Sequence, residues 1–304
     1  MSVENNEAAC PCCASCGVAE IDDVKLVPCD DCDLVKYCCD DCMEDHKSEH
    51  EEECKKRAAE LRDEILFKQP ESSHLGDCPI CCLPLPLDMT KSCTMTCCSK
   101  KICRGCEYAN QMREREMRLQ LSCPFCREPL LFTDEECDKQ RMKRVEANDP
   151  AAMRQQGGKQ HEKGDYRSAF EYYTKAAALG DIDAHSKLSL MYREAEYVKQ
   201  DEGKYIHHIE EAAIGGHPDA RFILGYEEHK IGNIERAVKH WIIAATQGDD
   251  GSIKALLKVF EGGFVKKEDL AAALRAHKAA VDATKSPQRA AAEIFRICSS
   301  EEIR

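Results

Sequence analysis

The chain has 304 residues and a formal net charge of −13, so it has room for two or three domains. The acidic charge is concentrated at the start, because residues 1–75 hold 20 Asp and Glu against 8 Lys and Arg. Nucleic-acid binding usually requires a basic surface, so we expect no nucleic-acid partner. No segment approaches the length of a membrane span, and the polar residues 1–9 lack the apolar stretch of a signal peptide. We therefore expect no membrane partner.

Cysteine is confined almost entirely to the first half, where 21 of the 22 cysteines precede residue 138. Most form pairs with two or three residues between them: Cys13/Cys16, Cys29/Cys32, Cys38/Cys42, Cys78/Cys81, Cys103/Cys106 and Cys123/Cys126. This spacing lets two thiolates reach one tetrahedral Zn²⁺ from a tight turn. Disulfides are the alternative, but they require an oxidising compartment and hence a secretion signal. We expect zinc binding in the cytoplasm, the nucleus or both.

The first module holds eight ligand-type residues, enough for two four-coordinate zinc ions: Cys13, Cys16, Cys29, Cys32, Cys38, Cys42, His50 and Cys54. The Tyr37-Cys38 step and the spacing of the last three ligands resemble the MYND zinc finger. The resemblance implies interleaved binding. One zinc would take Cys13, Cys16, Cys38 and Cys42, and the other Cys29, Cys32, His50 and Cys54.

One segment of this module departs from the MYND pattern, which often places an aromatic residue, commonly Trp, just before the ligand histidine. Residues 45–49 offer only His46, which could compete with His50 as a ligand, although the spacing favours His50. Many MYND fingers act by binding proline-containing peptides, and this departure weakens the expectation that this finger binds them. The surplus thiols Cys10, Cys12 and Cys39 are expected to face solvent.

Residues 54–70 predict a helix, because Ala58, Leu61, Ile65 and Leu66 fall on one face and charged residues on the other. Residues 70–73 contain a proline and two serines, and we expect them to form a hinge.

The second module opens with Cys78-Pro-Ile-Cys81, continues with Cys103-Arg-Gly-Cys106 and closes with Cys123-Pro-Phe-Cys126. These motifs resemble a RING finger, in an all-cysteine form that lacks the usual histidine. The implied cross-brace places Cys78, Cys81, Cys103 and Cys106 on one zinc. The other zinc would take Cys123 and Cys126, with Cys98 as one further ligand. The remaining ligand is Cys97 in our interpretation, with Cys93 the alternative.

The RING resemblance also implies contacts with a ubiquitin-conjugating enzyme. Ile80, between the first two ligands, would supply an exposed apolar contact, and Pro124 in the last knuckle would flank it. Arg127 stands where active RING fingers often carry a cation that bonds both the enzyme and ubiquitin. Residues 107–121 are expected to form the central helix. Cys82 and Cys137 are expected to bind no metal.

The second half repeats a pattern in which an Asp, Asn or Glu is followed eleven and twelve positions later by Ala-Ala, and fifteen later by Gly. The copies start at Asp165, Asp201 and Asn233, and a worn copy starts at Glu268 with Ala283 in place of the glycine. The intervals of 36, 32 and 35 residues are typical of helical repeats.

This pattern resembles Sel-1-like repeats, a family of helix-turn-helix units related to tetratricopeptide repeats. The small residues let helices approach closely, and larger side chains fill the gaps between layers: Tyr172, Tyr173, Leu188, Tyr192, Leu224 and Trp241. Stacked helix pairs of this kind bury a continuous core and bind other proteins. Residues 287–303 predict one more helix, with Cys298 an incidental thiol.

The sequence thus predicts small zinc-stabilised α+β modules followed by an all-α helical-repeat solenoid. The expected domains are a MYND-type finger (10–54), a helical linker (55–75), a RING-type finger (76–130), a connecting helix (131–147), the repeat solenoid (148–283) and a C-terminal capping helix (284–304). Four structural Zn²⁺ ions are expected.

Two functions fit these modules. The first is a RING-type ubiquitin ligase that binds a conjugating enzyme through the RING and a protein substrate through the MYND finger and the repeats. It would act by positioning, without a covalent catalytic residue. The second is a non-enzymatic interaction adaptor. A metalloenzyme is disfavoured because sixteen ligands on four zinc ions leave no open coordination position. A cysteine nucleophile is also disfavoured, because no His/Asn constellation accompanies the spare thiols.

Overall fold

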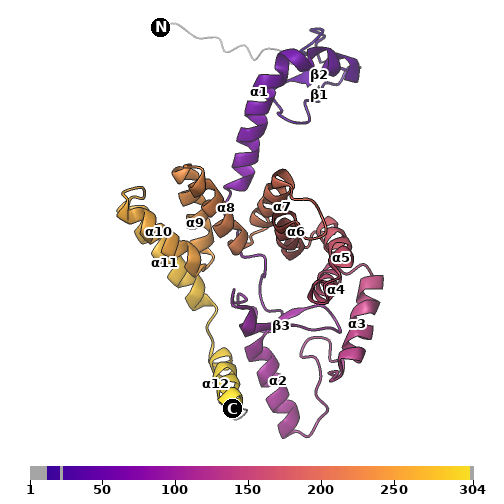
Figure 1. Ribbon diagram of the computed structural model, residues 1–304, viewed down its shortest axis with the longest axis vertical. Helices are drawn as coiled ribbons and strands as arrows, with labels where there is room; N and C mark the ends of the chain where they lie inside the picture. The colour runs from indigo at the N-terminus through magenta and orange to yellow at the C-terminus, as the bar shows by residue number, and fades with distance from the viewer. Residues whose placement is uncertain (1–11, 21–22, 302–304) are drawn as a thin grey trace. The chain divides into compact units, whose positions relative to one another are not determined.

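The computed structural model describes residues 12–20 and 23–301, with side chains up to residue 297. The chain divides into two compact units, Met1–Lys68 and Gln69–Arg304, each with its own core (Figure 1). No helix among the described residues is both long and apolar enough to cross a membrane.

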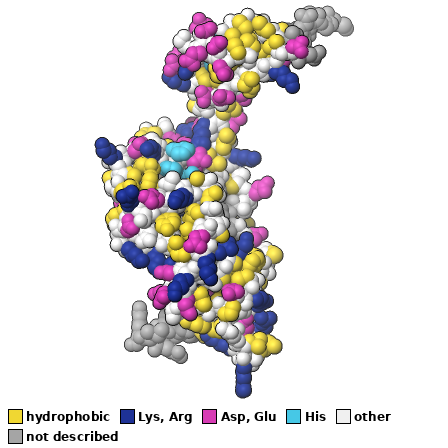
Figure 2. All heavy atoms as spheres, turned by 90° about the vertical axis from the view of Figure 1, so that its right-hand side faces the viewer, with side chains coloured by type: hydrophobic (Ala, Val, Ile, Leu, Met, Phe, Trp, Pro, Cys, Tyr) yellow, Lys and Arg dark blue, Asp and Glu magenta, His cyan; other side chains and the backbone are white. Residues whose placement is uncertain are grey.

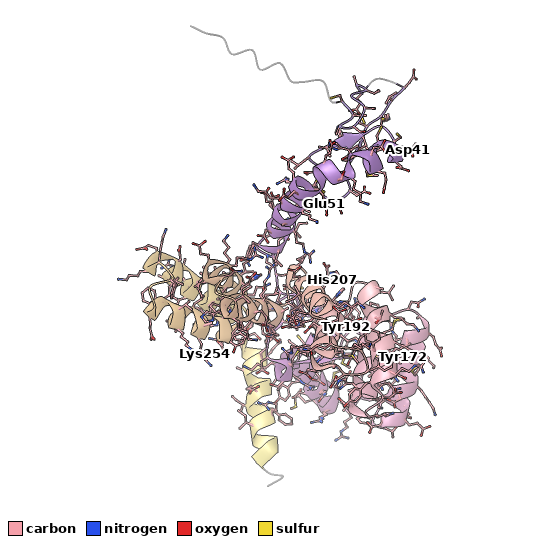
Figure 3. All side chains as sticks on the ribbon, turned by 45° about the horizontal axis from the view of Figure 1, so that its top comes forward. Asp41, Glu51, Tyr172, Tyr192, His207 and Lys254 are labelled. Carbon is pink, nitrogen blue, oxygen red and sulfur yellow. The ribbon has the colours of Figure 1, made fainter. Side chains whose placement is uncertain are left out.

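The first unit is a small hairpin set against one long helix. Strands β1 (Val27–Pro28) and β2 (Lys36–Tyr37) pair antiparallel, and helix α1 spans Asp40–Leu66. Its small core contains Leu26 and Tyr37 packed among cysteines. Many Asp and Glu side chains lie on the face of this unit that Figure 2 shows, and Figure 3 labels Asp41 and Glu51 on α1.

Helix α1 begins earlier than the sequence pattern predicts. The expected helix covered residues 54–70, whereas α1 starts at Asp40 and already contains the ligand-type residues Cys42, His50 and Cys54. Asp40 and Asp41 occupy its first turn, where acidic side chains favour the positive end of the helix dipole. The apolar pattern located only the second half, because the first half carries ligand-type residues, Cys42 and His50, where an amphipathic helix would carry apolar ones.

The second unit starts with the second zinc module. It contains the short 3₁₀ helix η1 (Met89–Lys91), the antiparallel strands β3 (Ser92–Thr94) and β4 (Lys101–Cys103), and helix α2 (Arg104–Glu116). Helix α2 starts three residues before the expected helix and ends five residues before its expected end. Helix α3 (Asp134–Glu146) then leads to the repeats.

The repeat array consists of paired helices: α4 (Pro150–Glu162), α5 (Tyr166–Ala178), α6 (Ile182–Glu194), α7 (Glu202–Ile214), α8 (Pro218–Lys230), α9 (Ile234–Thr246), α10 (Asp250–Glu261) and α11 (Lys267–Ala283). Each helix packs against its neighbours along the chain. Helix α12 (Pro287–Glu301) follows and packs on α2 instead. The expected fold class, zinc-binding cysteine-rich modules followed by a helical solenoid, is confirmed.

Large side chains fill the core of the array, as the repeat pattern predicts. Tyr173 and Trp241 are buried, and Tyr172 is half-buried against the same core. Trp241 donates its indole N–H to Phe222 O at 3.2 Å. A side chain at Gly225 would meet the indole at 2.4 Å, so only glycine fits there. Figure 3 labels Tyr172, Tyr192 and His207 on the helices α5, α6 and α7.

Aspartate starts most of the array helices. The side chains of Asp149, Asp165, Asp181, Asp201 and Asp249 each accept the backbone N–H three residues later. Such an N-cap typically stabilises a helix by about 1 kcal/mol. Asp149, Asp181 and Asp249 stand before the first helix of their repeats. His217 stands at the same position before α8, and its side chain makes no cap hydrogen bond. His217 therefore lacks the cap hydrogen bond of the aspartates, and its ring stacks on His74 instead.

The segment that leads into the second zinc module lies along the turns between repeats. Ser72 O accepts a hydrogen bond from Gln247 Nε2 at 3.1 Å, and His74 N–H donates to Gly216 O at 3.0 Å. The expected hinge at residues 70–73 is therefore partly bound to the array. Its proline and serines are typical of a hinge, but only the fold shows that their backbone has a partner.

Candidate zinc centres and interaction surfaces

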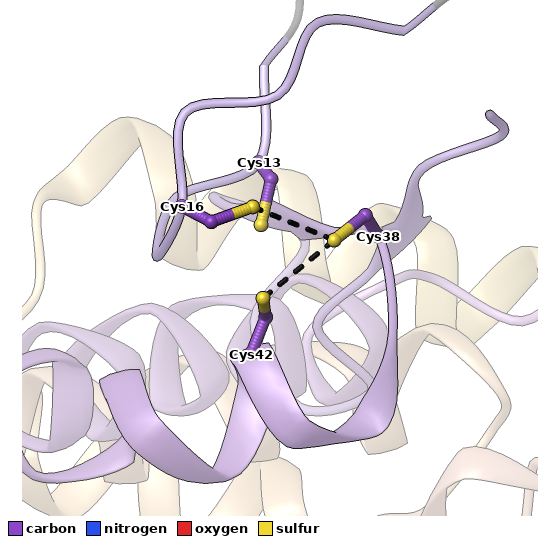
Figure 4. A group of neighbouring side chains, drawn as sticks. All are labelled: Cys13, Cys16, Cys38 and Cys42. Carbon is purple, nitrogen blue, oxygen red and sulfur yellow. Dashed lines mark hydrogen bonds between the residues drawn. The ribbon is translucent and has the colours of Figure 1, made fainter.

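The first cysteine group gathers at the start of α1 (Figure 4). Cys13 and Cys16 come from a turn, Cys38 directly follows β2, and Cys42 lies in the first turn of α1. Cys38 Sγ lies 3.6 Å from Cys16 Sγ and 3.6 Å from Cys42 Sγ. All four sulfurs lie within 4.8 Å of one another.

The second group joins Cys29 and Cys32 to two residues of α1. Cys32 Sγ lies 3.0 Å from His50 Nε2, and Cys29 Sγ lies 3.7 Å from Cys54 Sγ. Cys42, His50 and Cys54 are eight and four residues apart, so they share one face of α1. One helix therefore carries residues of both groups.

His46 lies on the same helix face but outside both groups. Its Nδ1 lies 3.1 Å from the hydroxyl of the buried Tyr37, and its ring stacks on His50 at 5.8 Å between ring centres. The structure therefore places His50, not His46, among the possible zinc ligands.

The third group surrounds the start of α2. Cys78 and Cys81 come from a turn, and Cys103 and Cys106 flank the N-terminus of the helix. Cys81 Sγ lies 3.8 Å from Cys103 Sγ. Backbone N–H groups point at the sulfurs, since Cys103 N–H donates to Cys78 Sγ at 3.5 Å and Cys106 N–H donates to Cys103 Sγ at 3.4 Å. These bonds favour the thiolate form that zinc requires.

The fourth group joins two adjacent cysteines to the last pair. Cys97 Sγ lies 3.3 Å from Cys126 Sγ, and Cys98 Sγ lies 3.9 Å from Cys123 Sγ. The alternative, Cys93, lies outside the group and directs its sulfur at Glu107, with Oε2 at 3.3 Å. The geometry therefore favours Cys97 over Cys93. The third and fourth groups alternate along the chain, as in a cross-brace.

One backbone turn recurs in these groups. The N–H of its first residue donates to the carbonyl five residues later, and a left-handed residue four positions on donates back. Copies begin at Cys13, Cys78 and Cys123, with left-handed Gly17, Cys82 and Arg127. A further copy begins at Met95, with left-handed Ser99. In this copy Met95 stands at the position where the other copies carry their first cysteine. The turn still offers two sulfurs to the fourth group, because Cys97 lies next to Cys98. In the sequence, the Met95-x2-Cys98 spacing is the signal of this copy of the turn.

The donor sets fit zinc. Tetrahedral Zn²⁺ with Zn–S bonds of about 2.3 Å would hold its sulfurs about 3.8 Å apart. Five of the six sulfur–sulfur distances named above, which involve all four groups, lie between 3.6 and 3.9 Å. A disulfide requires about 2.05 Å, and every cysteine from Cys12 to Cys137 is a free thiol.

The thiol pKa values have the pattern expected of crowded sulfurs. The side-chain hydrogen bond with Cys103 is the largest cause that lowers the pKa of Cys78, to about 4. Burial is the main cause that raises the pKa of Cys106 to about 12, and the negative charge of Cys78 also raises it. The group therefore favours the thiolate form of Cys78 and disfavours that of Cys106.

A fifth group, His74, Asp183 and His217, links the start of the second module to the array. Asp183 Oδ1 lies 2.8 Å from His74 Nε2 and 3.7 Å from His217 Nε2. The two rings stack 4.2 Å apart and 3° from parallel, whereas imidazoles on one tetrahedral ion converge from different directions. Arg154 and Lys101 also lie 3.2 and 4.0 Å from Asp183 Oδ2. We therefore interpret this group as a docking contact, for which His217 replaces a helix cap.

The residues expected to contact a conjugating enzyme lie in two of the turns. Ile80 is 40% exposed. Pro124 is buried, so the exposed apolar side chain of its turn is Phe125, at 43%. Arg127 is exposed, and its Nη1 donates to Asn110 Oδ1 at 2.8 Å.

The surplus thiols have different surroundings. Cys12, Cys39 and Cys82 are exposed, and Cys39 Sγ lies 3.8 Å from Cys38 Sγ. Cys137 is half-buried and lies outside the metal-type groups of the described residues. Cys10 and the side chain of Cys298 lie outside the described residues.

Comparison with known families identifies two of the three predicted modules. Residues 13–54 match the MYND finger. Residues 151–181, 182–217 and 218–249 each match the Sel1 repeat. These two resemblances are confirmed, and residues 55–150 lie outside both matches. No curated protein sequence matches the chain.

Two solved structures are similar in fold. A Sel1 repeat protein from Oxalobacter formigenes is 22% identical with a TM-score of 0.43, over 57% of this chain and 71% of that one. A protective antigen present in uropathogenic Escherichia coli strains, which displays an SLR fold, is 20% identical with a TM-score of 0.41. That match covers 57% of this chain and 37% of the antigen.

The two family matches, to the MYND finger and the Sel1 repeat, indicate the general character of the chain. The MYND finger is a zinc-binding domain, and the Cys/His groups described above are able to hold zinc ions. Sel1 repeats generally mediate protein–protein interaction. A zinc finger joined to such repeats suggests a protein-interaction adaptor.

Proposed function

We propose that the chain is a RING-type ubiquitin ligase. In this proposal, residues 76–130 form a RING finger that captures a ubiquitin-conjugating enzyme, while the MYND finger and the Sel1 repeats recruit a protein substrate. The observation that carries the proposal is the alternation of the two cysteine groups between Cys78 and Cys126. Four pairs of ligands, with the first and third on one site and the second and fourth on the other, are the cross-brace that a RING implies.

The exposed apolar side chains of the module support this proposal. Ile80 and Phe125 project from two of the turns that would hold zinc, although such turns have no need of exposed apolar residues for their own folding. Isolated exposed residues are common on any protein. Two of them on paired zinc turns are better explained by a docking surface.

Arg127 would act on the ubiquitin thioester by positioning. One of its N–H groups is bound by Asn110 Oδ1, which orients the guanidinium. The remaining N–H donors are free to bond the conjugating enzyme and ubiquitin together. No covalent intermediate on this chain is required, because the gain comes from holding the reacting groups in place.

Substrate recruitment falls to the other two modules. The MYND finger has a surface groove of about 710 Å³ beside Cys29, His50 and Cys54. The repeat array offers its own surface for protein contacts. Because zinc thiolates persist in reducing compartments, we place this activity in the cytoplasm, the nucleus or both.

The test is transfer of ubiquitin from a panel of conjugating enzymes charged with it. The wild-type chain should speed discharge by at least one enzyme, and Ile80→Ala and Phe125→Ala should weaken capture of that enzyme. Ile231→Ala is the matched control, because Ile231 is exposed at 73% on the repeat array. Discharge should be unchanged in this control.

Arg127→Ala separates transfer from folding. Asn110 Oδ1 keeps a second donor, Arg113 Nη2 at 3.1 Å, so the loss of Arg127 leaves no buried acceptor unpaired. Zinc content and thermal stability should stay near wild type while ubiquitin discharge falls strongly. If no enzyme of the panel discharges, and neither Ile80→Ala nor Arg127→Ala alters any binding, the chain is an adaptor rather than a ligase.

A further inference from the structure

The C-terminal helix α12 packs on the second zinc module, more than 150 residues away in sequence. It lies beside α2 (Figure 1), and the rings of Tyr108 and Phe295 meet 5.1 Å apart. Ala292 is buried in this contact, whereas Ile294 is 64% exposed and Ile297 46%. Much of the apolar side-chain surface of α12 up to residue 297 therefore stays exposed.

Arg289, at the start of α12, makes a polar contact with the turn of the third cysteine group. Its Nη1 donates to Pro84 O at 2.7 Å, and its Nη2 donates to Leu83 O at 3.1 Å and to Cys81 Sγ at 3.4 Å. Nη1 also donates to Thr284 O at 2.7 Å, which ties the guanidinium to the end of the array. The guanidinium thus contacts a ligand sulfur and the carbonyl groups of the turn that carries it.

A close backbone approach lies at the same cysteine group. A Cβ placed on Gly105 would come within 2.8 Å of Arg289 N and 2.9 Å of Arg289 Cα. Gly105 lies between Cys103 and Cys106, so α12 contacts both turns of ligands in this group. The two observations are independent, because one concerns a side chain and the other a backbone contact.

We propose that Arg289 is a positioning residue of this zinc site, and that α12 stays docked on the module only while zinc is bound. Four thiolates around one Zn²⁺ carry a net negative charge, which the guanidinium offsets through a charge-assisted N–H···S bond. Mutation of a residue that bonds a metal ligand in this way typically lowers metal affinity by about 10- to 100-fold. Without the metal, the turn at Cys81 loses its constraint and Arg289 loses its counter-charge. The proposal rests on zinc binding by this group and is independent of ubiquitin transfer.

The first experiment measures zinc retention of the full chain. Arg289→Ala should release one zinc ion, counted by native mass spectrometry, at about 10- to 100-fold lower chelator than wild type. Arg289→Lys should restore retention in part, because an ammonium keeps the charge but not the planar fork. Arg296→Ala is the control on the same helix, since Arg296 is exposed and donates to Glu293. It should retain zinc like wild type.

The second experiment measures hydrogen exchange in residues 78–84 and 287–297. Exchange in both segments should rise in Arg289→Ala and after zinc is stripped from wild type. Gly105→Ala should raise exchange in residues 287–297 although every ligand and Arg289 remain. The fluorescence of Trp241, the single tryptophan, checks that the array stays folded.

Two results would overturn the proposal. Zinc release from Arg289→Ala at the same chelator concentration as from Arg296→Ala would remove the role of Arg289. Unchanged protection of residues 287–297 after zinc removal would remove the dependence of α12 on the metal.

Discussion

Met95 stands where the recurring zinc turn elsewhere begins with a cysteine. The turn keeps its two backbone hydrogen bonds without that sulfur, so a cysteine at its first position is not required for its backbone conformation. His217 is a comparable case, since three other repeats start with a capping aspartate. In both cases the backbone keeps the local structure, a turn or a helix start, and the residue that departs from the pattern makes a different contact. Met95 is buried in the module core, and His217 contacts His74.

The fourth cysteine group gives a prediction at this scale. Cys97→Ser should remove one zinc ion and destabilise the second module, because Cys97 Sγ lies in the group with Cys126. Cys93→Ser should keep the full zinc content, because Cys93 lies outside the group and bonds Glu107. Native mass spectrometry of the two variants checks this. Loss of zinc from Cys93→Ser alone would assign the site to Cys93.

At the scale of elements, helices do more than fill the core. Helix α1 carries residues of two cysteine groups on one face, so its formation and zinc binding depend on each other. The array helices depend instead on close packing, in which α8 approaches α9 at Gly225. Glycine in a helix interior costs about 1 kcal/mol relative to alanine, so its presence indicates a steric need.

Two glycine substitutions test this packing. Gly225→Ala should destabilise the array by about 1–3 kcal/mol, because its Cβ would meet Trp241 at 2.4 Å. Gly158→Ala is the matched change in α4, where the nearest atom is Tyr173 Oη at 3.7 Å. It should stabilise the array by about 0.4–1 kcal/mol. Urea denaturation followed by Trp241 fluorescence measures both. Equal effects of the two changes would contradict the steric explanation.

For the whole molecule, the two halves are stabilised by different means. The cysteine-rich modules have small cores in which ligand-type cysteines are themselves much of the buried surface. The array buries aromatic and aliphatic side chains in continuous clusters. Structural zinc contributes roughly 10–16 kcal/mol to the folding of a small domain in favourable cases. The modules should therefore respond to metal and the array should not.

Metal removal checks this difference. Elemental analysis of the purified chain should give four zinc ions, one for each cysteine group. A chelator should then unfold residues 13–54 and 78–126, seen as rapid hydrogen exchange, while Trp241 fluorescence stays unchanged. Two or fewer zinc ions per chain would refute the assignment of four sites.

The array should weaken in mild acid. Burial is the main cause that lowers the pKa of both His217 and His240 to about 3, against an unfolded value of about 6.5. Below pH 6.5 the unfolded chain takes up protons that the folded array refuses, so stability is complete above this pH and is lost as the pH falls toward 3. Each histidine contributes a slope of up to about 1.4 kcal/mol per pH unit.

Urea denaturation followed by Trp241 fluorescence measures this loss between pH 7.5 and 5. Around His217 the other charged or titratable groups are His74, Asp183, Lys187 and Lys101. His217→Gln should reduce the slope, because one buried imidazole is removed. A midpoint that is constant over this pH range would contradict the prediction.

Local sequence patterns identify the MYND finger, the Sel1 repeats and the fold class of cysteine-rich modules followed by a helical solenoid. The reason is that each depends on local spacing: two residues between cysteines suit a tight turn, and a recurring Ala-Ala-x-x-Gly pattern marks helices that pack closely. The MYND and Sel1 resemblances rest on such spacing. Apolar periodicity did not predict the start of α1, because this part of the helix carries ligand-type residues instead of an apolar face.

Three features follow from packing rather than from local pattern: the position of Cys97 beside Cys98, the contact of residues 72–74 with the repeat turns, and the packing of α12 on α2. These features depend on contacts between residues far apart in sequence, such as Cys81 and Arg289, which are separated by 208 positions. A pair so far apart leaves no periodic pattern in the chain. Its energy comes from a geometry that exists only after the second module and α12 have packed together.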